Sequence, residues 1–98
     1  MTTFFVSRHP GAVAWAQRQV LQIDVWPTHL DPQKVDAGDT VIGSLPLHLA
    51  AAVCARGARF MHLTLDIPAE WRGRELSAAD LETACARLEE FTVERKSC

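Results

Sequence analysis

The sequence has few cysteines and lacks the common metal-binding and nucleotide-binding motifs. Its three cysteines, Cys54, Cys85 and Cys98, are an odd number without CxxC spacing, and no HxH or HExxH pair is present. A zinc site is therefore not expected, and the thiols are expected to be reduced. The absence of GxGxxG and of GxxxxGKS/T excludes the usual dinucleotide and nucleoside-triphosphate sites. We predict no cofactor and no metal. Magnesium is an alternative, because Mg²⁺ needs few protein ligands and the chain has four scattered carboxylates that could contribute. These are Asp24, Asp31, Asp39 and Asp66.

The sequence also lacks a long apolar run and an excess of positive charge. Its longest apolar run, LHLAAAVCA, is far shorter than the roughly 18 residues that span a bilayer, so no membrane segment is expected. No secretory leader opens the chain, so we predict a cytoplasmic protein. The net charge of −2 argues against binding to long nucleic acids, which usually needs a basic stripe that neutralises many phosphates. A small anionic ligand held by a few local cations is still allowed.

Length and composition predict one small globular domain over residues 1–98. With 48% hydrophobic and 22% charged residues, the chain has too much apolar material for a disordered protein. A domain of this size buries only about two-thirds of the surface that its unfolded chain exposes, so its core is expected to be thin. We therefore predict a homodimer, in which a second copy covers part of the remaining apolar surface.

Apolar runs and turn residues predict strands that alternate with helices, in the order β-α-β-β-α-β-α. Strands are expected at residues 4–6, 23–26, 40–42 and 59–65, with a short edge strand at residues 91–93. The first helix is expected to begin at Pro10 and to bury a stripe of Val13, Ala16 and Val20. A second helix is expected over residues 47–54; it is apolar on more than one side and is ended by Gly57. A third is expected over residues 77–90, with Ser77 and Asp80 forming a capping box at its start. The alternation predicts a small Rossmann-like α/β domain, a mainly parallel sheet flanked by helices.

Two strand-to-helix junctions resemble one another. FFVSRHPGAVAWA, residues 4–16, and TVIGSLPLHLAAA, residues 40–52, each read as strand, serine, proline and helix. In open parallel sheets, ligands bind beyond the carboxyl ends of the strands, where helix N-termini favour anions. We therefore expect both junctions at one binding edge.

The first junction carries the residues that we predict to be catalytic, Ser7, Arg8 and His9. Arginine offers a planar set of donors to a phosphate, and histidine exchanges a proton near neutral pH. Serine adds a neutral hydroxyl. The alternative is structural: Pro10 restricts His9 to extended geometry, Arg8 is solvated, and Ser7 bonds to nearby backbone.

Ligand-binding residues are predicted around this group. The second junction can present backbone N–H groups to an anion, and glycine lets a ligand approach the main chain, although Ser44 has the alternative role of a helix N-cap. His29 can contact a base through its ring or simply pack in a loop. The turn at residues 72–74, Arg-Gly-Arg, can reach a phosphate, but a solvated turn is favoured. The predicted binding set is Gly11, His29, Gly43, Ser44, Leu45 and Pro46.

Four separated blocks together resemble a known family. FVSRHPGAVAWA, HLD, GDTVIGSLPLHLAAAVCARGARFMHLTLDIP and RGRELSAADLE agree in order and spacing with small CRISPR-associated accessory proteins found beside type III interference systems. The resemblance covers nearly the whole chain. It implies a CARF-like domain, similar to the sensor domains that bind cyclic oligoadenylate. It also implies a ring nuclease that linearises cyclic tetra-adenylate and so switches off the antiviral response.

Three other functions are weighed against a metal-independent ring nuclease. The first is a sensor or sponge that binds cyclic oligoadenylate without cutting it. The second is a truncated histidine phosphatase, but Pro10 interrupts its Arg-His-Gly motif and the chain is about half the length needed. The third is an adaptor that binds a protein through Trp71 and the last helix.

Overall fold

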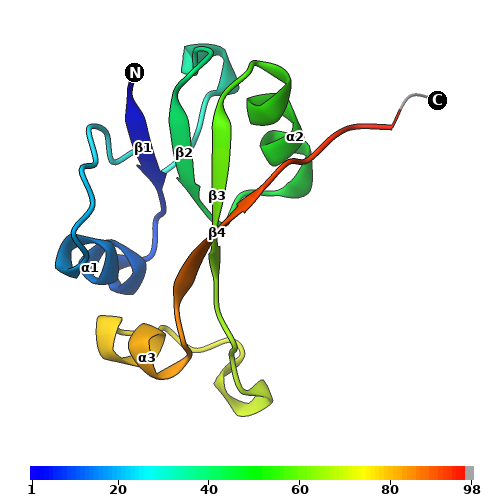
Figure 1. The fold of residues 1–98 in the computed structure, drawn as a ribbon. Helices are drawn as coiled ribbons and strands as arrows, with labels where there is room; N and C mark the ends of the chain where they lie inside the picture. Colours follow the sequence, from blue (N-terminus) through cyan, green and yellow to red (C-terminus); the bar gives the residue numbers. More distant parts are fainter. Residues whose placement is uncertain (97–98) are drawn as a thin grey trace.

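The structure is a computed structural model that describes residues 1–96 (Figure 1). Cys98, expected to be a reduced thiol, lies outside the described residues, whereas Cys54 and Cys85 are free thiols. The strands are β1 (Thr3–Val6), β2 (Thr40–Gly43), β3 (Arg59–Thr64) and β4 (Arg87–Phe91); the helices are α1 (Pro10–Arg18), α2 (Leu47–Ala55) and α3 (Ala78–Thr83); and two short 3₁₀ helices are η1 (Pro32–Lys34) and η2 (Ala69–Trp71).

The four strands form one sheet in the order β1-β2-β3-β4. The pairs β1–β2 and β2–β3 are parallel, and β4 is antiparallel to β3. Helices flank this sheet, so the predicted α/β class with a mainly parallel sheet is confirmed, and the architecture is consistent with a Rossmann-like fold.

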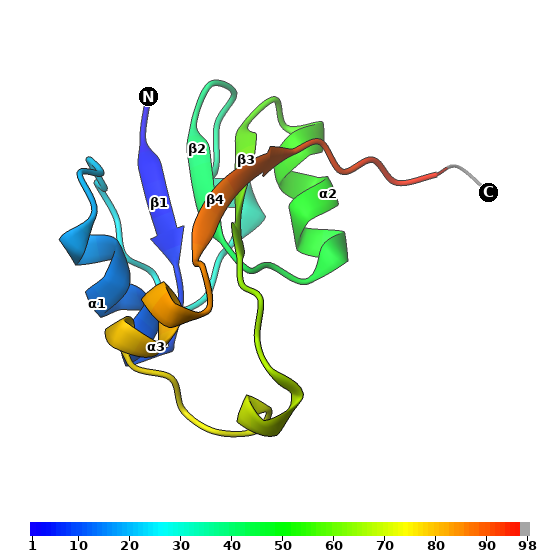
Figure 2. The same cartoon turned by 60° about the horizontal axis from the view of Figure 1, so that its bottom comes forward.

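Each face of the sheet carries its own hydrophobic cluster. Successive side chains of a strand point to opposite faces, so Phe4 and Phe5 belong to different clusters. Phe4 packs with Val53 of α2, whereas Phe5 packs with Trp15 of α1 and Leu81 of α3. Figures 1 and 2 show α1 and α3 side by side, away from α2.

The predicted strand at residues 23–26 is wrong as a full strand. It is reduced to one parallel bridge between Val25 and Phe4. The segment still runs beside β1, because Phe5 N donates to Val25 O at 2.9 Å and Ser7 N donates to Pro27 O at 3.2 Å. Pro27 has no N–H to donate, which limits the ladder that this edge can build. The central position expected for the first strand is therefore wrong: β1 is an edge strand of the four-stranded sheet, and residues 24–27 cover its outer side through one bridge and a few backbone hydrogen bonds.

The predicted helix over residues 77–90 is also wrong in its second half. The Ser77–Asp80 capping box is present, but the helix ends at Thr83, and Cys85 has a φ of 57°. β4 then pairs with β3, and Ala86 and Leu88 pack on the cluster around α1 and α3. The edge strand expected at residues 91–93 lies instead at Arg87–Phe91 and shares only Phe91 with the prediction. A strand here satisfies the free backbone groups of β3.

The helices bury less of their apolar surface than predicted. In α1 the buried side chains include Ala12, Trp15 and Ala16, while Val20 lies beyond the helix and is fully exposed. In α2 only Ala50 and Val53 are buried, and Leu47 is 75% exposed. Gly57 does follow α2 with a φ of 85°, as expected of a left-handed helix end. Within residues 1–96, no helix combines the length and apolar character needed to cross a membrane.

Asp39 ties the N-terminus of the chain to the loop before β2. Its carboxylate accepts hydrogen bonds from Thr2 N at 2.8 Å and from Asp36 N at 2.9 Å, and the residue is only 5% exposed. The backbone hydrogen bonds from Asp36 and then Thr2 hold the pKa of Asp39 below its ordinary value, against the opposing effect of burial.

We expect this carboxylate to make the protein less stable in acid. A carboxyl group whose pKa is lowered by folding stabilises the folded state above its unfolded pKa, and that stabilisation is lost as the pH falls through the folded pKa. The melting temperature should therefore fall between about pH 5 and pH 2. Asp39→Asn should be less stable than the parent at pH 7 and show a smaller decrease over that range. The matched control is Asp36→Asn, because Asp36 contributes its backbone N–H to this network. Equal acid sensitivity of Asp39→Asn and the parent would contradict the assignment.

Candidate functional site

The carboxyl ends of the parallel strands open into a pocket. Val6, the last residue of β1, pairs with Gly43, the last residue of β2, so both predicted junctions leave the sheet at the same level. The pocket has a volume of about 590 Å³. Its walls come from the ends of β1, β2 and β3, the starts of α1 and α2, and the segment before α3. The lining residues are Val6, Ser7, Arg8, His9, Ala12, Thr28, His29, Leu30, Ser44, Leu45, Pro46, Leu49, Leu63, Leu65, Ile67, Arg74, Glu75, Leu76 and Leu81.

Seven of the nine predicted site residues line this pocket. These residues are Ser7, Arg8, His9, His29, Ser44, Leu45 and Pro46. They come from three segments far apart in the sequence, which the parallel register brings to one edge. The structure places them together; their roles stay predictions.

The first junction turns from β1 into α1 through a short hydrogen-bonded loop. Ser7 Oγ accepts a hydrogen bond from His9 N at 3.1 Å, and His9 is the N-cap of α1 with Pro10 in the first helical turn. No side-chain hydrogen bond caps this helix end. Arg8 and His9 are both exposed. The serine thus shapes the loop and keeps its own proton available, while the arginine and histidine side chains can reach a ligand.

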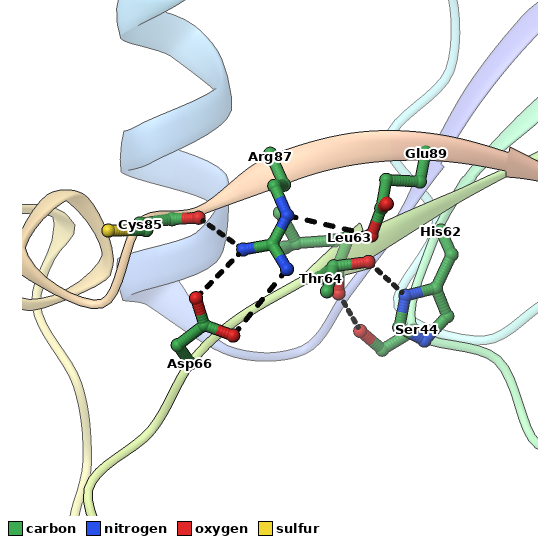
Figure 3. Close-up of polar contacts among 8 residues, drawn as sticks. All are labelled: Ser44, His62, Leu63, Thr64, Asp66, Cys85, Arg87 and Glu89. Atoms are coloured by element: carbon green, nitrogen blue, oxygen red, sulfur yellow. Dashed lines mark hydrogen bonds and ion pairs between the residues drawn. The ribbon is translucent and has the colours of Figure 1, made fainter.

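At the second junction the structural alternative for Ser44 is wrong. The N-cap of α2 is Pro46. Ser44 Oγ instead donates a hydrogen bond to Leu63 O of β3 at 3.0 Å, which ties the junction to the neighbouring strand (Figure 3). In the same view His62 contacts Thr64, with Nδ1 and Oγ1 3.0 Å apart.

Two predicted binding residues lie outside the pocket lining, and both serve packing. Gly43 has a φ of 148°, and a Cβ added there would lie 2.5 Å from Val6 O. Gly11 is buried, and a Cβ added there would overlap the carbonyl oxygen of Leu76. Glycine is therefore needed at these positions so that two backbone segments can meet closely.

The aspartates considered for magnesium are engaged separately. Asp24 accepts from Thr3 N, and Asp31 caps η1. Asp39 binds Thr2 N, and Asp66 pairs with Arg87. In residues 1–96, no group of three or more His, Cys, Asp or Glu side chains is placed to hold a metal ion.

Arg74 lines the pocket, although a solvated turn was the favoured prediction for residues 72–74. Its guanidinium carbon lies 4.3 Å from the centre of the Trp71 ring, and its Nη2 lies 3.3 Å from Asp80 Oδ1. Spacing alone does not place Arg74 at the sheet edge, because the intervening segment leaves the sheet and returns. The available signal was the pair of arginines in EWRGREL, beside the Ser77–Asp80 capping box.

A polar cluster joins the two ends of the segment that connects β3 to β4 (Figure 3). Arg87 Nη1 lies 3.1 Å from Asp66 Oδ2 and donates to Cys85 O at 3.1 Å. Arg87 Nε also lies 3.6 Å from Glu89 Oε1. Asp66 N donates to Ala84 O at 2.8 Å. The end of β3, which continues into the pocket wall, is thereby fixed to the start of β4.

Comparison with protein-family models identifies the group to which this architecture belongs. Residues 4–94 match the family described as "Putative CRISPR-associated protein (Cas_VVA1548)". The chain belongs to this CRISPR-associated family. The matched range includes both junctions and Arg74, so every wall of the pocket in this CRISPR-associated chain lies within it. A search of curated proteins and a search of solved structures gave no match.

We expect Gly11→Ala to destabilise the fold by moving a pocket wall. The added methyl group would force α1 away from the Leu76 backbone, which costs about 1–3 kcal/mol for an overpacked site. For a domain of this size, each kcal/mol lowers the melting temperature by about 4–8 °C. Gln17→Ala, at an exposed position of α1, is the matched control, and surface changes of this kind stay within about 0.5 kcal/mol. Thermal unfolding by circular dichroism measures both, and an unchanged melting temperature of Gly11→Ala would contradict this packing.

Proposed function

We propose that this CRISPR-associated protein binds cyclic oligoadenylate at the pocket and linearises it as a ring nuclease, with cyclic tetra-adenylate as the main substrate. The observation that carries the proposal is that Arg8, His9 and His29 line one pocket at the carboxyl edge of a parallel sheet. This is where Rossmann-like folds bind phosphate-containing ligands. Membership of a CRISPR-associated family and the resemblance to ring nucleases support the choice of ligand.

The pocket combines the two surfaces that a nucleotide needs. Part of its lining is apolar, with side chains such as Leu63, Leu65 and Leu81, and suits the faces of adenine rings. The lining also includes Arg8 and His9, which immediately precede α1, where the positive end of the helix dipole favours phosphate.

Cleavage in this proposal is an intramolecular transesterification. A ribose 2′-oxygen attacks the adjacent phosphorus, the P–O5′ bond breaks, and the products are a 2′,3′-cyclic phosphate and a 5′-hydroxyl. The 2′-hydroxyl loses its proton and the 5′-oxygen gains one. His9 exchanges a proton in this step, Arg8 stabilises the phosphate charge, and Ser7 positions the loop through its bond to His9 N. The reaction needs in-line geometry and charge stabilisation, and no metal takes part in these steps.

The size of the pocket favours a symmetric dimer. Pockets of about 300–1,000 Å³ bury one drug-sized ligand, and 590 Å³ falls within that range. A ring of four nucleotides is larger, so a second copy facing the first would be needed to enclose it. Leu47 at the start of α2 is 75% exposed and Ile67 at the pocket is 41% exposed, which leaves apolar surface for such a contact.

Arg8→Ala should mainly weaken ligand binding, whereas His9→Ala should mainly slow cleavage. Loss of a charge-assisted contact of about 1.5–3 kcal/mol should make Arg8→Ala bind cyclic tetra-adenylate roughly tenfold to a hundredfold more weakly. His9→Ala should bind nearly as well as the parent and cleave about a hundredfold more slowly in single-turnover assays, because its role is confined to the transition state.

The control for both is His48→Ala, an exposed histidine on α2 that does not line the pocket. The assays are run with and without EDTA, and cleavage is expected in both. Tight binding with an unchanged ligand would favour the sponge instead. Parent-rate cleavage by a folded His9→Ala would move the proton transfer to His29, or leave cleavage to positioning by Ser7 and Ser44 alone.

The protein should sediment as a dimer at micromolar concentration. The thin core and the exposed apolar residues of α2 leave surface that a second copy would cover. Analytical ultracentrifugation of the parent and of Leu47→Glu measures this, and the variant should shift toward monomer. A parent that is monomeric throughout would remove the symmetric ring site.

A further inference from the structure

We infer that Arg74 is a second phosphate-binding residue of the pocket, supplied by the segment between β3 and α3 and held in place by Trp71 and Asp80. The inference rests on the proposed function and deepens it. Arg74 is 67 positions away from Ser7 in the chain numbering, yet both residues line the same pocket. Figure 2 shows the segment that carries Arg74, in yellow-green and yellow, leaving the sheet and returning to α3.

The guanidinium of Arg74 is held from two sides. It stacks on the Trp71 ring with 4.3 Å between the guanidinium carbon and the ring centre. Nη2 lies 3.3 Å from Asp80 Oδ1. Both contacts restrict a side chain that would otherwise have many rotamers, so ordering it on a ligand costs less entropy.

The carboxylate of Asp80 that contacts Arg74 is itself held by a hydrogen bond at the start of α3. Its Oδ2 accepts from Ser77 N at 3.0 Å, and its backbone N donates to Ser77 Oγ at 3.1 Å. One carboxylate oxygen thus caps α3 while the other receives Arg74. Trp71 and Asp80 act as positioning residues, since Trp71 and Asp80 do not line the pocket themselves.

Arg74 retains donors for a ligand. A guanidinium has five N–H donors, and the contact to Asp80 uses a single terminal nitrogen. The side chain is 48% exposed, so the remaining donors are accessible to an anion. Arg8 stands at the start of α1 and Arg74 before α3, so two guanidinium groups from different elements line one pocket. That pair suits a ligand with phosphates at separate points. The two positive charges exceed the single negative charge of Glu75 in the same lining.

The turn offers a matched control for this residue. Arg72 carries the same charge two positions away, is exposed, and does not line the pocket. Arg72→Ala therefore changes the net charge by the same amount as Arg74→Ala. Any difference between the two variants reports position and not overall electrostatics. Arg74→Lys keeps the charge but loses the planar stacking on Trp71.

The test measures equilibrium binding of fluorescently labelled cyclic tetra-adenylate to the full chain over a series of salt concentrations. Arg74→Ala should bind roughly tenfold or more weakly, and its log–log salt slope should decrease by about 0.7, the value for one lost phosphate contact to a single strand. Arg72→Ala should match the parent in both quantities. Arg74→Lys should keep most of the salt slope and bind more weakly than the parent.

Three results would overturn the inference. If the parent binds and Arg74→Ala binds equally well, Arg74 is not a phosphate contact and the proposed function stands. If Arg72→Ala loses as much affinity and salt slope as Arg74→Ala, the effect is one of net charge. If the parent does not bind cyclic tetra-adenylate, the proposed ligand and the role of Arg74 fail together. Melting temperatures of all variants show whether a loss of binding comes from unfolding.

Discussion

The meeting of β1 and β2 at Val6 and Gly43 is the constraint on which the pocket depends. The two strand ends pair in parallel, and the Gly43 α-carbon lies so close to Val6 O that a side chain would not fit. The φ of 148° at Gly43 is also one that other residues rarely adopt. Because the strands end at the same level, the Ser7 and Ser44 loops leave the sheet together. Ser44 then fixes this edge to β3 through its bond to Leu63 O.

Much of this arrangement was predictable, because its signals are local. Strand, serine, proline and helix recur in both junctions, and the general rule for parallel sheets places such junctions at one edge. The capping box at Ser77 and the left-handed Gly57 are also set by residues a few positions apart. Local chemistry therefore indicated seven residues that share the pocket, and the family match supports the resemblance to CRISPR-associated proteins.

The rest depends on contacts that no local pattern records. Leu81 and Leu88 fit a helix spacing, but after Cys85 turns with a φ of 57° the chain gains more by pairing with the open edge of β3. Gly11 resembled a ligand-approach glycine, whereas the close neighbour is the backbone of Leu76, 65 positions later in the chain numbering. Arg74 reaches the pocket only because the segment that carries it folds back onto α1. Such facts belong to tertiary structure and not to periodicity.

The excursion between β3 and β4 has a consequence for how this family can diversify. Residues 67–83 leave the sheet and return where Asp66 N donates to Ala84 O, and Arg87 adds a second link by contacting Asp66 and Cys85 O. A segment whose ends are pinned together outside the sheet can change length without disturbing strand register, and doubling a loop costs only about 0.6 kcal/mol in closure entropy. Evolution can therefore lengthen, shorten or replace residues 67–75, ahead of the backbone of Leu76 and the buried Ala78 and Leu81, while the strands stay intact. Relatives would be expected to differ in length and sequence at this stretch before they differ in the strands.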